Sequence, residues 1–187
     1  MKKYLITSLK LTTIMLVLLS VIYPLFIAGV ALFALGKGKG ETLSKDGKVV
    51  GYENIGQSFT EDRYFWGRPS AAGYNAAGSS GSNKGPTNPE YLKTVSDRID
   101  TFLLHNPGIE RSRIPADLVT ASGSGLDPDI SPDGARVQVK RVAVTRHLNE
   151  SKVASLVESH IEKPLLGFLG PEKINVLKLN IALDQLQ

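Results

Sequence analysis

Residues 11–35 read LTTIMLVLLSVIYPLFIAGVALFAL, a run without a charged side chain. As an α-helix this run would be roughly 37 Å long at about 1.5 Å per residue, which is enough to cross a hydrocarbon core of roughly 30 Å. Lys10 precedes the run and Lys37 follows it, where lipid headgroups would lie. We therefore predict a short flank over residues 1–10 and a membrane-spanning helix over residues 11–35.

The same run could be read as a cleaved signal peptide, because Gly29, Val30 and Ala31 resemble a small-residue cleavage site. The apolar segment of a signal peptide is usually only about 7–15 residues long, however. We therefore read the run as a retained anchor. A single early span favours a cytoplasmic N-terminus and an extracytoplasmic domain.

Two features of the span point to contact with a neighbouring membrane helix. Pro24 lacks an N–H, so it should kink the helix and free a carbonyl for another partner. Ala28, Gly29, Ala31 and Ala34 give a thin face that lets a second helix approach closely. Small residues are also common in membrane helices without such a role, and this alternative stays open. Pro24 and Gly29 are the candidate partner-binding residues of the span.

The charge distribution separates the anchor from the rest of the chain. The first 48 residues hold seven Lys and two acidic residues, whereas the rest hold 15 basic and 16 acidic ones. The basic character thus belongs to the membrane flanks, and nucleic-acid binding loses its electrostatic support. The chain has no Cys, which excludes disulfides, thiolate nucleophiles and Cys-ligated metals. We expect a linker over residues 36–47 and one soluble domain over residues 48–187.

Hydrophobic periodicity predicts an α+β domain with a small sheet and about three main helices. Asn88, Ser131 and Asn149 are good helix caps, each placed before an amphipathic run. The pattern over residues 174–183, INVLKLNIAL, alternates as in a strand. The expected elements are a strand or short hairpin over residues 48–59, helices over residues 89–105, 132–147 and 150–161, and a strand over residues 174–183.

A cluster of aromatic residues opens a long segment rich in Gly, Ser and Asn. The cluster reads YFWGR and ends at Arg68. The segment that follows, residues 67–89, is too long for an ordinary connection, so it is either a functional loop or disordered. Aromatic and Arg side chains often anchor interfaces. They can equally be core residues beneath the loop, and both interpretations stay open. The candidate partner-binding residues are Tyr64, Phe65, Trp66 and Arg68.

A second loop rich in Gly and Ser, over residues 121–132, can be compared with three chemistries. An EF-hand calcium loop that began at Asp127 would need Gly at the position of Pro132 and Glu at the position of Gln138. A serine nucleophile at Ser124 lacks the G-x-S-x-G elbow. Backbone N–H groups of such a loop can bind an anion. The remaining alternative is a tight turn that needs Gly for its backbone angles.

Basic and histidine side chains offer little further chemistry. Arg136, Lys140 and His147 form an outward stripe on the predicted helix, with Arg141 and Arg146 beside it. Such a stripe is usually a solvated face, and its alternative is an acidic partner or a phosphate. The three His of the chain show no i,i+4 pair, so we predict no metal site.

The ordered series of motifs resembles one known family, the small C subunit of the Kdp potassium-transporting P-type ATPase. The resemblance covers nearly the whole chain. The motifs are, in chain order, G-Q-x-F at residues 56–59, Y-F-W-G-R-P-S at 64–70, S-x-G-S-N-x-G-P-T-N-P at 79–89, P-A-D-L-V-T-A-S-G-S-G-L-D-P-x-I-S-P at 115–132, Q-V-x-R-V-A at 138–143 and N-V-L-x-L-N at 175–180.

The resemblance implies a role in high-affinity potassium uptake at a bacterial inner membrane. A channel-like subunit of such a complex selects potassium, and a P-type ATPase subunit hydrolyses ATP. The C subunit is described for the family as a non-catalytic assembly subunit, or as a catalytic chaperone that promotes ATP binding by the ATPase subunit. Neither a Walker loop nor a D-K-T-G motif occurs in this chain, so we expect no catalytic residue. One departure is Asp129, where the family motif leads us to expect His.

If the chaperone role holds, ATP would be a shared ligand and not a tightly bound cofactor. The residues expected to contact it are Ser122, Gly123, Ser124, Gly125 and Gln138. This expectation conflicts with an extracytoplasmic domain, which cannot reach cytoplasmic ATP.

Two other function classes remain as alternatives from the residues alone. One is a membrane-tethered serine hydrolase that uses Ser124 with His147. The other is an envelope ligand-binding module that uses Tyr64, Trp66 and Tyr74.

Overall fold

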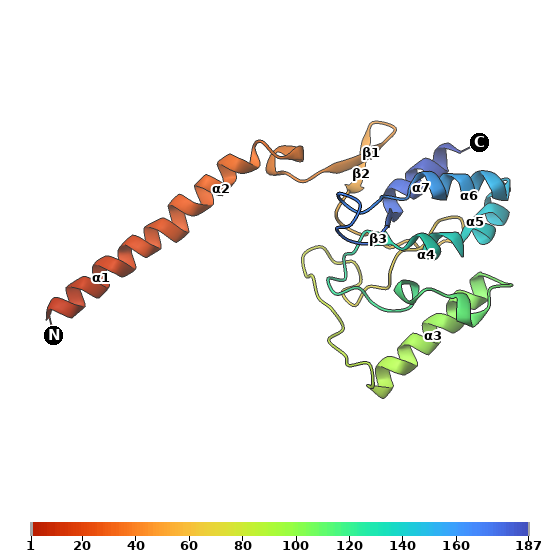
Figure 1. The fold of residues 1–187 in the computed structure, drawn as a ribbon, viewed down its shortest axis with the longest axis horizontal. Coiled ribbons are helices and arrows are strands. Elements are labelled where there is room, and N and C mark those ends of the chain that lie inside the picture. The colour runs from red at the N-terminus through yellow and green to blue at the C-terminus, as the bar shows by residue number, and fades with distance from the viewer. Residues whose placement is uncertain (1, 187) are drawn as a thin grey trace. The chain divides into compact units, whose positions relative to one another are not determined.

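A computed structural model describes residues 2–186 of the chain. It divides into two compact units, Met1–Thr42 and Leu43–Gln187. The first unit is mainly one long helix. The second holds five α-helices and two short 3₁₀ helices among the described residues, and nearly all of two small sheets (Figure 1).

The N-terminal unit contains one apolar helix with a widened turn. Helix α1, Lys2–Val17, continues through a π turn, Leu18–Ile22, into α2, Tyr23–Ala31. Pro24 has no N–H to donate to the carbonyl one α-helical turn earlier, and the π turn lies directly before it. The segment Lys3–Ala31 is long and apolar enough to cross a membrane. It begins before residue 11, where the predicted span starts, and ends at Ala31, before residue 35, where the predicted span ends.

The second unit is mixed α+β, which confirms the predicted fold class. Its two sheets each have two strands, and β3 and β4 pair antiparallel with Ile130 opposite Ile174. The elements are β1, Thr42–Lys45; β2, Lys48–Tyr52; α3, Pro89–His105; β3, Asp129–Ile130; α4, Pro132–Arg136; α5, Val139–Arg146; α6, Glu150–Ser159; β4, Ile174–Asn175; and α7, Val176–Gln185.

Three predicted helix caps are confirmed. The side chain of Asn88 accepts a hydrogen bond from the backbone N–H of Tyr91 at the start of α3. Ser131 accepts one from Gly134 at the start of α4, and Asn149 caps α6. The helix predicted up to His147 is divided into α4 and α5 by a break at residues 137–138.

The strand predicted over residues 174–183 is wrong. Only residues 174–175 pair as a strand, and the remainder forms α7. Asn175 caps this helix by accepting a hydrogen bond from Lys178 N at 3.0 Å. The buried positions include Val176, Leu179 and Leu183, which follow the helical spacing of three to four residues. The strand was predicted because apolar residues alternate along this run.

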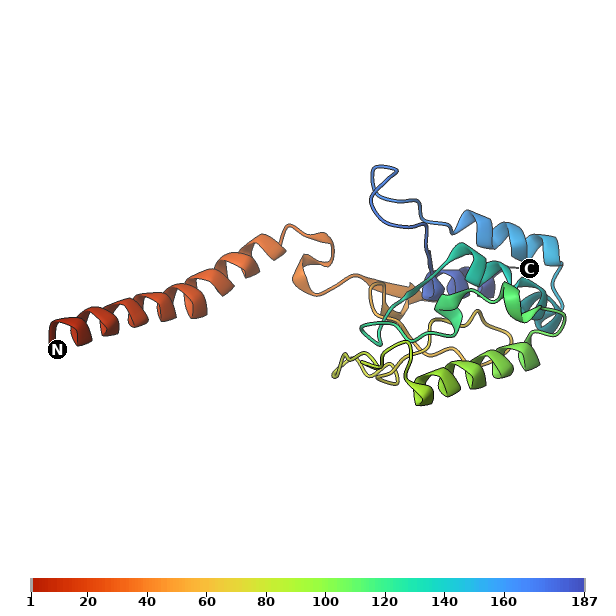
Figure 2. The same ribbon diagram turned by 60° about the horizontal axis from the view of Figure 1, so that its bottom comes forward.

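The core of the second unit lies between α3 on one side and α6 on the other, and α4, α5, α7 and irregular segments run between them (Figures 1 and 2). Phe65 and Ile174 are fully buried there, with Leu179 and Leu183 of α7. Arg141 is also buried, which corrects its expected place beside an outward basic stripe. Its guanidinium has acceptors inside the domain, so burial does not leave the charge without partners.

The long segment after the aromatic cluster is folded against the second Gly-rich loop. Ser122 N donates to Pro69 O at 3.1 Å, and Ser80 N donates to Ser124 O at 3.0 Å. The Ser70 hydroxyl donates to Gly125 O at 2.6 Å. The two loops thus satisfy each other's backbone groups.

Candidate functional site

The aromatic segment is held by two buried side-chain amides. Asn180 accepts a hydrogen bond from Phe65 N at 2.9 Å and donates one to Phe65 O at 3.0 Å. Gln138 accepts from Trp66 N at 2.8 Å and donates to Trp66 O at 3.2 Å. The amides therefore replace a neighbouring strand for two successive residues. A segment fixed in this way presents Trp66 in one orientation.

Arg141 also supports the segment around Trp66. Its guanidinium carbon lies 4.5 Å from the centre of the Trp66 ring, in cation–π contact. Burial lowers the pKa of Arg141 to about 10, against a smaller opposing effect of Asp62, so the side chain stays charged at neutral pH. Its hydrogen-bond acceptors are the side chains of Asn106 and Gln138 and the carbonyls of Asp62 and Tyr64.

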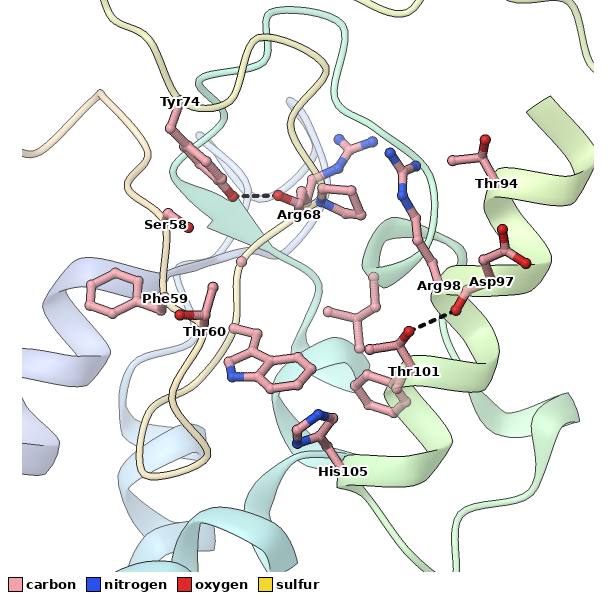
Figure 3. A pocket seen from close by; sticks show the side chains of 15 residues that line it. Ser58, Phe59, Thr60, Arg68, Tyr74, Thr94, Asp97, Arg98, Thr101 and His105 are labelled. Atoms are coloured by element: carbon pink, nitrogen blue, oxygen red, sulfur yellow. Dashed lines mark hydrogen bonds between the residues drawn. The ribbon is translucent and has the colours of Figure 1, made fainter. Parts of the chain in front are cut away.

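A pocket of about 530 Å³ lies between this segment and α3 (Figure 3). Trp66 meets Phe102 edge to face, with ring centres 6.4 Å apart, and meets His105 at 5.0 Å. The volume of this pocket is that of a typical ligand pocket. The lining residues are Ser58, Phe59, Thr60, Trp66, Gly67, Arg68, Pro69, Tyr74, Thr94, Asp97, Arg98, Thr101, Phe102, His105 and Leu118.

Two guanidinium groups lie at one end of the pocket, one from each wall (Figure 3). Arg68 pairs with Asp127 at 2.9 Å, and its buried Nε makes no hydrogen bond with the described residues. Arg98 donates to Val119 O at 3.0 Å, and none of the ion pairs among residues 2–186 includes it. The pocket thus offers an apolar floor and spare donors at one end. This arrangement suits an apolar group that carries an anionic or carbonyl end.

Tyr74 fixes the position of Arg68 in the pocket wall. Its hydroxyl donates to Arg68 O, as Figure 3 shows. Burial, with a contribution from Asp127, raises the pKa of Tyr74 to about 12. Tyr74 is therefore a neutral hydrogen-bond donor at any physiological pH.

The residues predicted to contact ATP lie in two different environments. Gln138 is fully buried, and its amide is used by Trp66, Gly134 and Arg141. Ser122 is also buried, and its hydroxyl accepts from Gly125 N at 2.9 Å.

Gly123 and Ser124 are the exposed members of the predicted set. The Ser124 hydroxyl accepts from Leu126 N at 3.1 Å, and among the described residues no hydrogen bond joins it to His147. No hydrogen bond in the described part of the chain joins this loop to Gln138 either. The assignment of these residues to ATP stays a prediction.

The predicted partner-binding residues are distributed over several places. Trp66 and Arg68 line the pocket, whereas Phe65 is a core residue. Tyr64 lies under the guanidinium of Arg146, 5.0 Å from it. Pro24 lies in the apolar helix together with Gly29, where an added Cβ would meet nothing within 4 Å. The aromatic cluster therefore supplies both core and surface, and neither interpretation alone describes all of it.

Two residues that build the site were missed from the sequence, Asn180 and Arg141. Asn180 lies in an apolar run at helical spacing from Val176 and Leu183, so its position could have marked it as a buried polar residue. Arg141 carries no such signal, because an Arg on a helix is usually exposed.

Asp129, the departure from the family motif, is paired inside the domain. Its carboxylate accepts a hydrogen bond from Lys173 at 2.7 Å, and its backbone N–H donates to Asp127. Asp129 opposes Asn175 in the register of β3 and β4. The ion pair thus links the loop before β4 to β3.

Comparison with protein families gives a match over residues 5–185 to the model described as KdpC, K+-transporting ATPase, c chain. The chain belongs to the KdpC family. It is 60% identical to the potassium-transporting ATPase KdpC subunit of Flavobacterium psychrophilum, over 99% of this chain and 100% of the relative. The KdpC subunits of Flavobacterium johnsoniae and Bacteroides thetaiotaomicron are 60% and 58% identical, and the alignments cover at least 98% of each chain.

Family membership makes this chain an accessory subunit of a potassium-transporting ATPase, with one candidate membrane helix. Potassium transport is therefore the process to which the KdpC fold contributes.

Proposed function

We propose that this KdpC subunit stabilises the assembly of the pump by binding its other subunits through two surfaces. One surface is the apolar helix with Pro24 and Gly29, and the other is the pocket beside Trp66. The proposed partners are a channel-like potassium-binding subunit and a P-type ATPase subunit. The chain itself would carry out no catalysis.

The observation that supports this proposal most strongly is the fixed, open wall of the pocket. Trp66 is clamped by Gln138 and contacted by Arg141, so it loses little conformational freedom when a partner binds. Trp and Arg are the residue types most enriched among interface hot spots. A partner side chain with an apolar body and a polar end would fit between Trp66 and Arg98.

A blocking substitution on α3 tests this use of the pocket. Thr101 lines the pocket, whereas Leu104 is 79% exposed on the same helix and does not line it. Thr101→Trp should fill the hollow and weaken recovery of the other subunits with an affinity-tagged chain by about tenfold, which corresponds to a loss of about 1.4 kcal/mol. Leu104→Trp is the matched control and should leave recovery unchanged. Equal recovery with both variants would contradict a partner in this pocket.

We further propose the finer role suggested by the family resemblance, promotion of ATP binding by the ATPase subunit. A direct contact would have to use Gly123 and Ser124, because they are the exposed members of the predicted set. Gln138 would then act indirectly, by holding Trp66 in place.

The ATP requirement of the assembled pump tests a direct contact. Ser124→Ala removes one hydroxyl and should raise the ATP concentration for half-maximal hydrolysis by about three- to tenfold if that hydroxyl binds nucleotide. An unchanged requirement would remove Ser124 from the proposal.

Topology decides whether any direct contact is possible. We propose a cytoplasmic N-terminus and an extracytoplasmic domain in a bacterial inner membrane, in which case promotion of ATP binding would act through the partner subunits. Because the chain has no Cys, a single Leu104→Cys thiol can be labelled in intact cells by a membrane-impermeant reagent. Labelling without permeabilisation would support the extracytoplasmic position, and labelling only after permeabilisation would contradict it.

A further inference from the structure

The loop between α6 and β4 carries the most concentrated exposed apolar surface of the second unit. Leu165 is 70% exposed, Leu166 and Phe168 are each 74% exposed, and Leu169 is 50% exposed. Figure 2 shows this loop standing clear of the helices. Clusters of this kind usually mark a contact with a partner or a membrane, because the exposure of apolar side chains to water is unfavourable.

The backbone of the loop is closed on itself. Leu165 and Leu169 exchange two hydrogen bonds, of 3.1 and 2.9 Å, and Gly167 N donates to Pro164 O at 2.9 Å. A second pair of hydrogen bonds, between Glu162 and Lys173, closes the base of the loop. The tip is therefore a short hairpin whose polar backbone groups are largely satisfied. Such a tip can enter an apolar medium at a low cost in unpaired N–H and C=O groups.

The tip is apolar on all sides, and charge begins at its base. Residues 164–171 contain no charged side chain, whereas Lys163 and Glu172 flank them. Leu166 has a positive φ of 56°, a strained conformation for a residue with a side chain, and its side chain is nevertheless exposed. The fold thus holds large apolar side chains outward where a turn of polar residues would be less strained.

We propose that the tip, Leu165–Leu169, inserts into the interfacial region of a lipid bilayer. A protein groove would cover one side of the hairpin, but lipid surrounds an inserted tip on every side. Leu is also under-represented among protein hot spots, whereas Leu and Phe are typical of segments that bury themselves in the interface.

The anchor of the same chain makes a weak insertion effective. The chain from Ala31 to Leu43 can extend over roughly 40 Å. A domain of this size has a radius of gyration of only about 15 Å. Tethering at this distance gives the tip a high effective concentration at the bilayer surface, so a modest intrinsic affinity is sufficient.

A single fluorescent label reports directly on the surroundings of the tip. The chain has no Cys, so Phe168→Cys gives one labelling position in the full-length protein. The labelled chain is reconstituted in vesicles of phosphatidylcholine and phosphatidylglycerol, with and without lipids that carry bromine on the acyl chains. We expect a blue-shifted emission and a loss of about half of the fluorescence on bromination, because interfacial segments lie roughly 5–10 Å deep. A label at Leu104→Cys, also highly exposed, should show neither change.

Polar substitutions in the tip, and a comparison with and without the other pump subunits, distinguish lipid from a protein interface. With the label at Leu165→Cys, the substitutions Leu166→Asp and Phe168→Asp should abolish quenching while Trp66 emission stays unchanged. A tip label that remains water-exposed in vesicles would overturn the proposal. A label that shifts only when the other pump subunits are present, without quenching by brominated lipid, would also overturn it and would indicate a protein interface.

Discussion

At the scale of single residues, the buried Arg141 connects several parts of the site. Its guanidinium binds Asn106 at 3.0 Å and Gln138 at 2.6 Å, and it lies over the ring of Trp66. Replacing it removes the hydrogen bond to the buried Asn106 Oδ1 and leaves Gln138 Oε1 with Trp66 N as its donor. The aromatic wall of the pocket should therefore depend on this one side chain.

We predict that Arg141→Met lowers the free energy of unfolding by about 1–3 kcal/mol, because it leaves the buried Asn106 Oδ1 without its donor. Chemical unfolding of the full-length chain in detergent, followed by Trp66 fluorescence, measures the change. Lys140→Met, at an exposed neighbour on α5, is the control and should change stability by less than about 0.5 kcal/mol. Equal stability of the two variants would contradict the role given to Arg141.

Asp184 supplies a prediction about pH. Burial raises the pKa of its carboxyl, but hydrogen bonds from Lys45 and Arg146 outweigh burial, so the pKa lies below its usual 3.8. A carboxyl with a lowered pKa stabilises the fold above its unfolded pKa, and this stabilisation is lost as pH falls through the folded pKa.

Asp184→Asn should therefore lower the free energy of unfolding at pH 7 by about 2 kcal/mol, the value of a charged hydrogen bond. The difference from wild type should be constant above pH about 5 and should narrow as the pH falls below about 4. Unfolding curves over this pH range measure it. Asp133→Asn, at an exposed pair with Arg136, should have almost no effect at any pH. A difference in the free energy of unfolding between wild type and Asp184→Asn that does not narrow in acid would contradict the role of the Asp184 carboxylate.

Single residues were predictable where their role is local. Asn88 and Asn149 cap helices through hydrogen bonds to residues two or three positions away, so the neighbouring sequence determines them. Asn180 and Gln138 bind backbone groups 115 and 72 residues away. No local pattern records such a distant partner, which is why both amides were missed as supports of the aromatic segment.

At the scale of elements, α7 shows how one run of residues can satisfy two periodicities. Leu177, Leu179 and Leu183 alternate as in a strand, yet the same run buries positions at helical spacing once Asn180 is counted as buried. The polar side chain of Asn180 hid the helical face, because its partner, Phe65, comes from a distant segment. The cap at Asn175 was the local signal that favoured a helix.

The second Gly-rich loop, residues 121–132, yields a prediction that separates two glycines. Gly125 has a φ of +70°, and an added Cβ would lie 2.8 Å from Ala72 Cβ and from Ser80 O. Gly125→Ala should thus lower the free energy of unfolding by about 2–3 kcal/mol, from strain and overlap together. Thermal unfolding of the full chain measures the loss.

Gly123 is the matched control, because an added Cβ there would meet nothing within 4 Å. Gly123→Ala should change stability by less than about 1 kcal/mol in either direction. If the loop contacts nucleotide through its exposed backbone, the Gly123→Ala variant would instead alter the ATP requirement of the assembled pump. Similar losses of stability in both variants would contradict a special backbone role for Gly125.

At the scale of the whole molecule, the long uncharged run separated a candidate membrane helix from an α+β domain, because uncharged length is a strong signal for such a helix. The pocket could not be foreseen in the same way. Its walls come from the segment around Trp66, from α3 and from Leu118, and only the tertiary fold brings them together. The sequence marked Trp66 and Arg68 as candidate interface residues, and both line the pocket, but it did not indicate Arg98 in the opposite wall.

Anchoring and docking are two separable roles of the apolar helix. An anchor requires only apolar length, whereas a docking helix also requires its particular surface: the π turn before Pro24 and the open side at Gly29. Replacing residues 1–35 with an unrelated single span of equal length keeps the anchor and removes that surface. We expect this variant to reach the membrane at the normal level but to recover the other pump subunits about tenfold less well, a loss typical of one central contact. Growth at low potassium should decrease together with the recovery of the other pump subunits.

Deletion of residues 1–35 is the companion experiment, because it removes both anchor and surface. It should release the domain from the membrane fraction and abolish growth at low potassium. If the replaced span supports normal recovery and growth while the deletion does not, the helix acts as an anchor alone, and binding of the other subunits rests on the second unit. A Gly29→Leu variant refines the result, since a bulky side chain at the open side blocks close approach of a helix without changing apolar length.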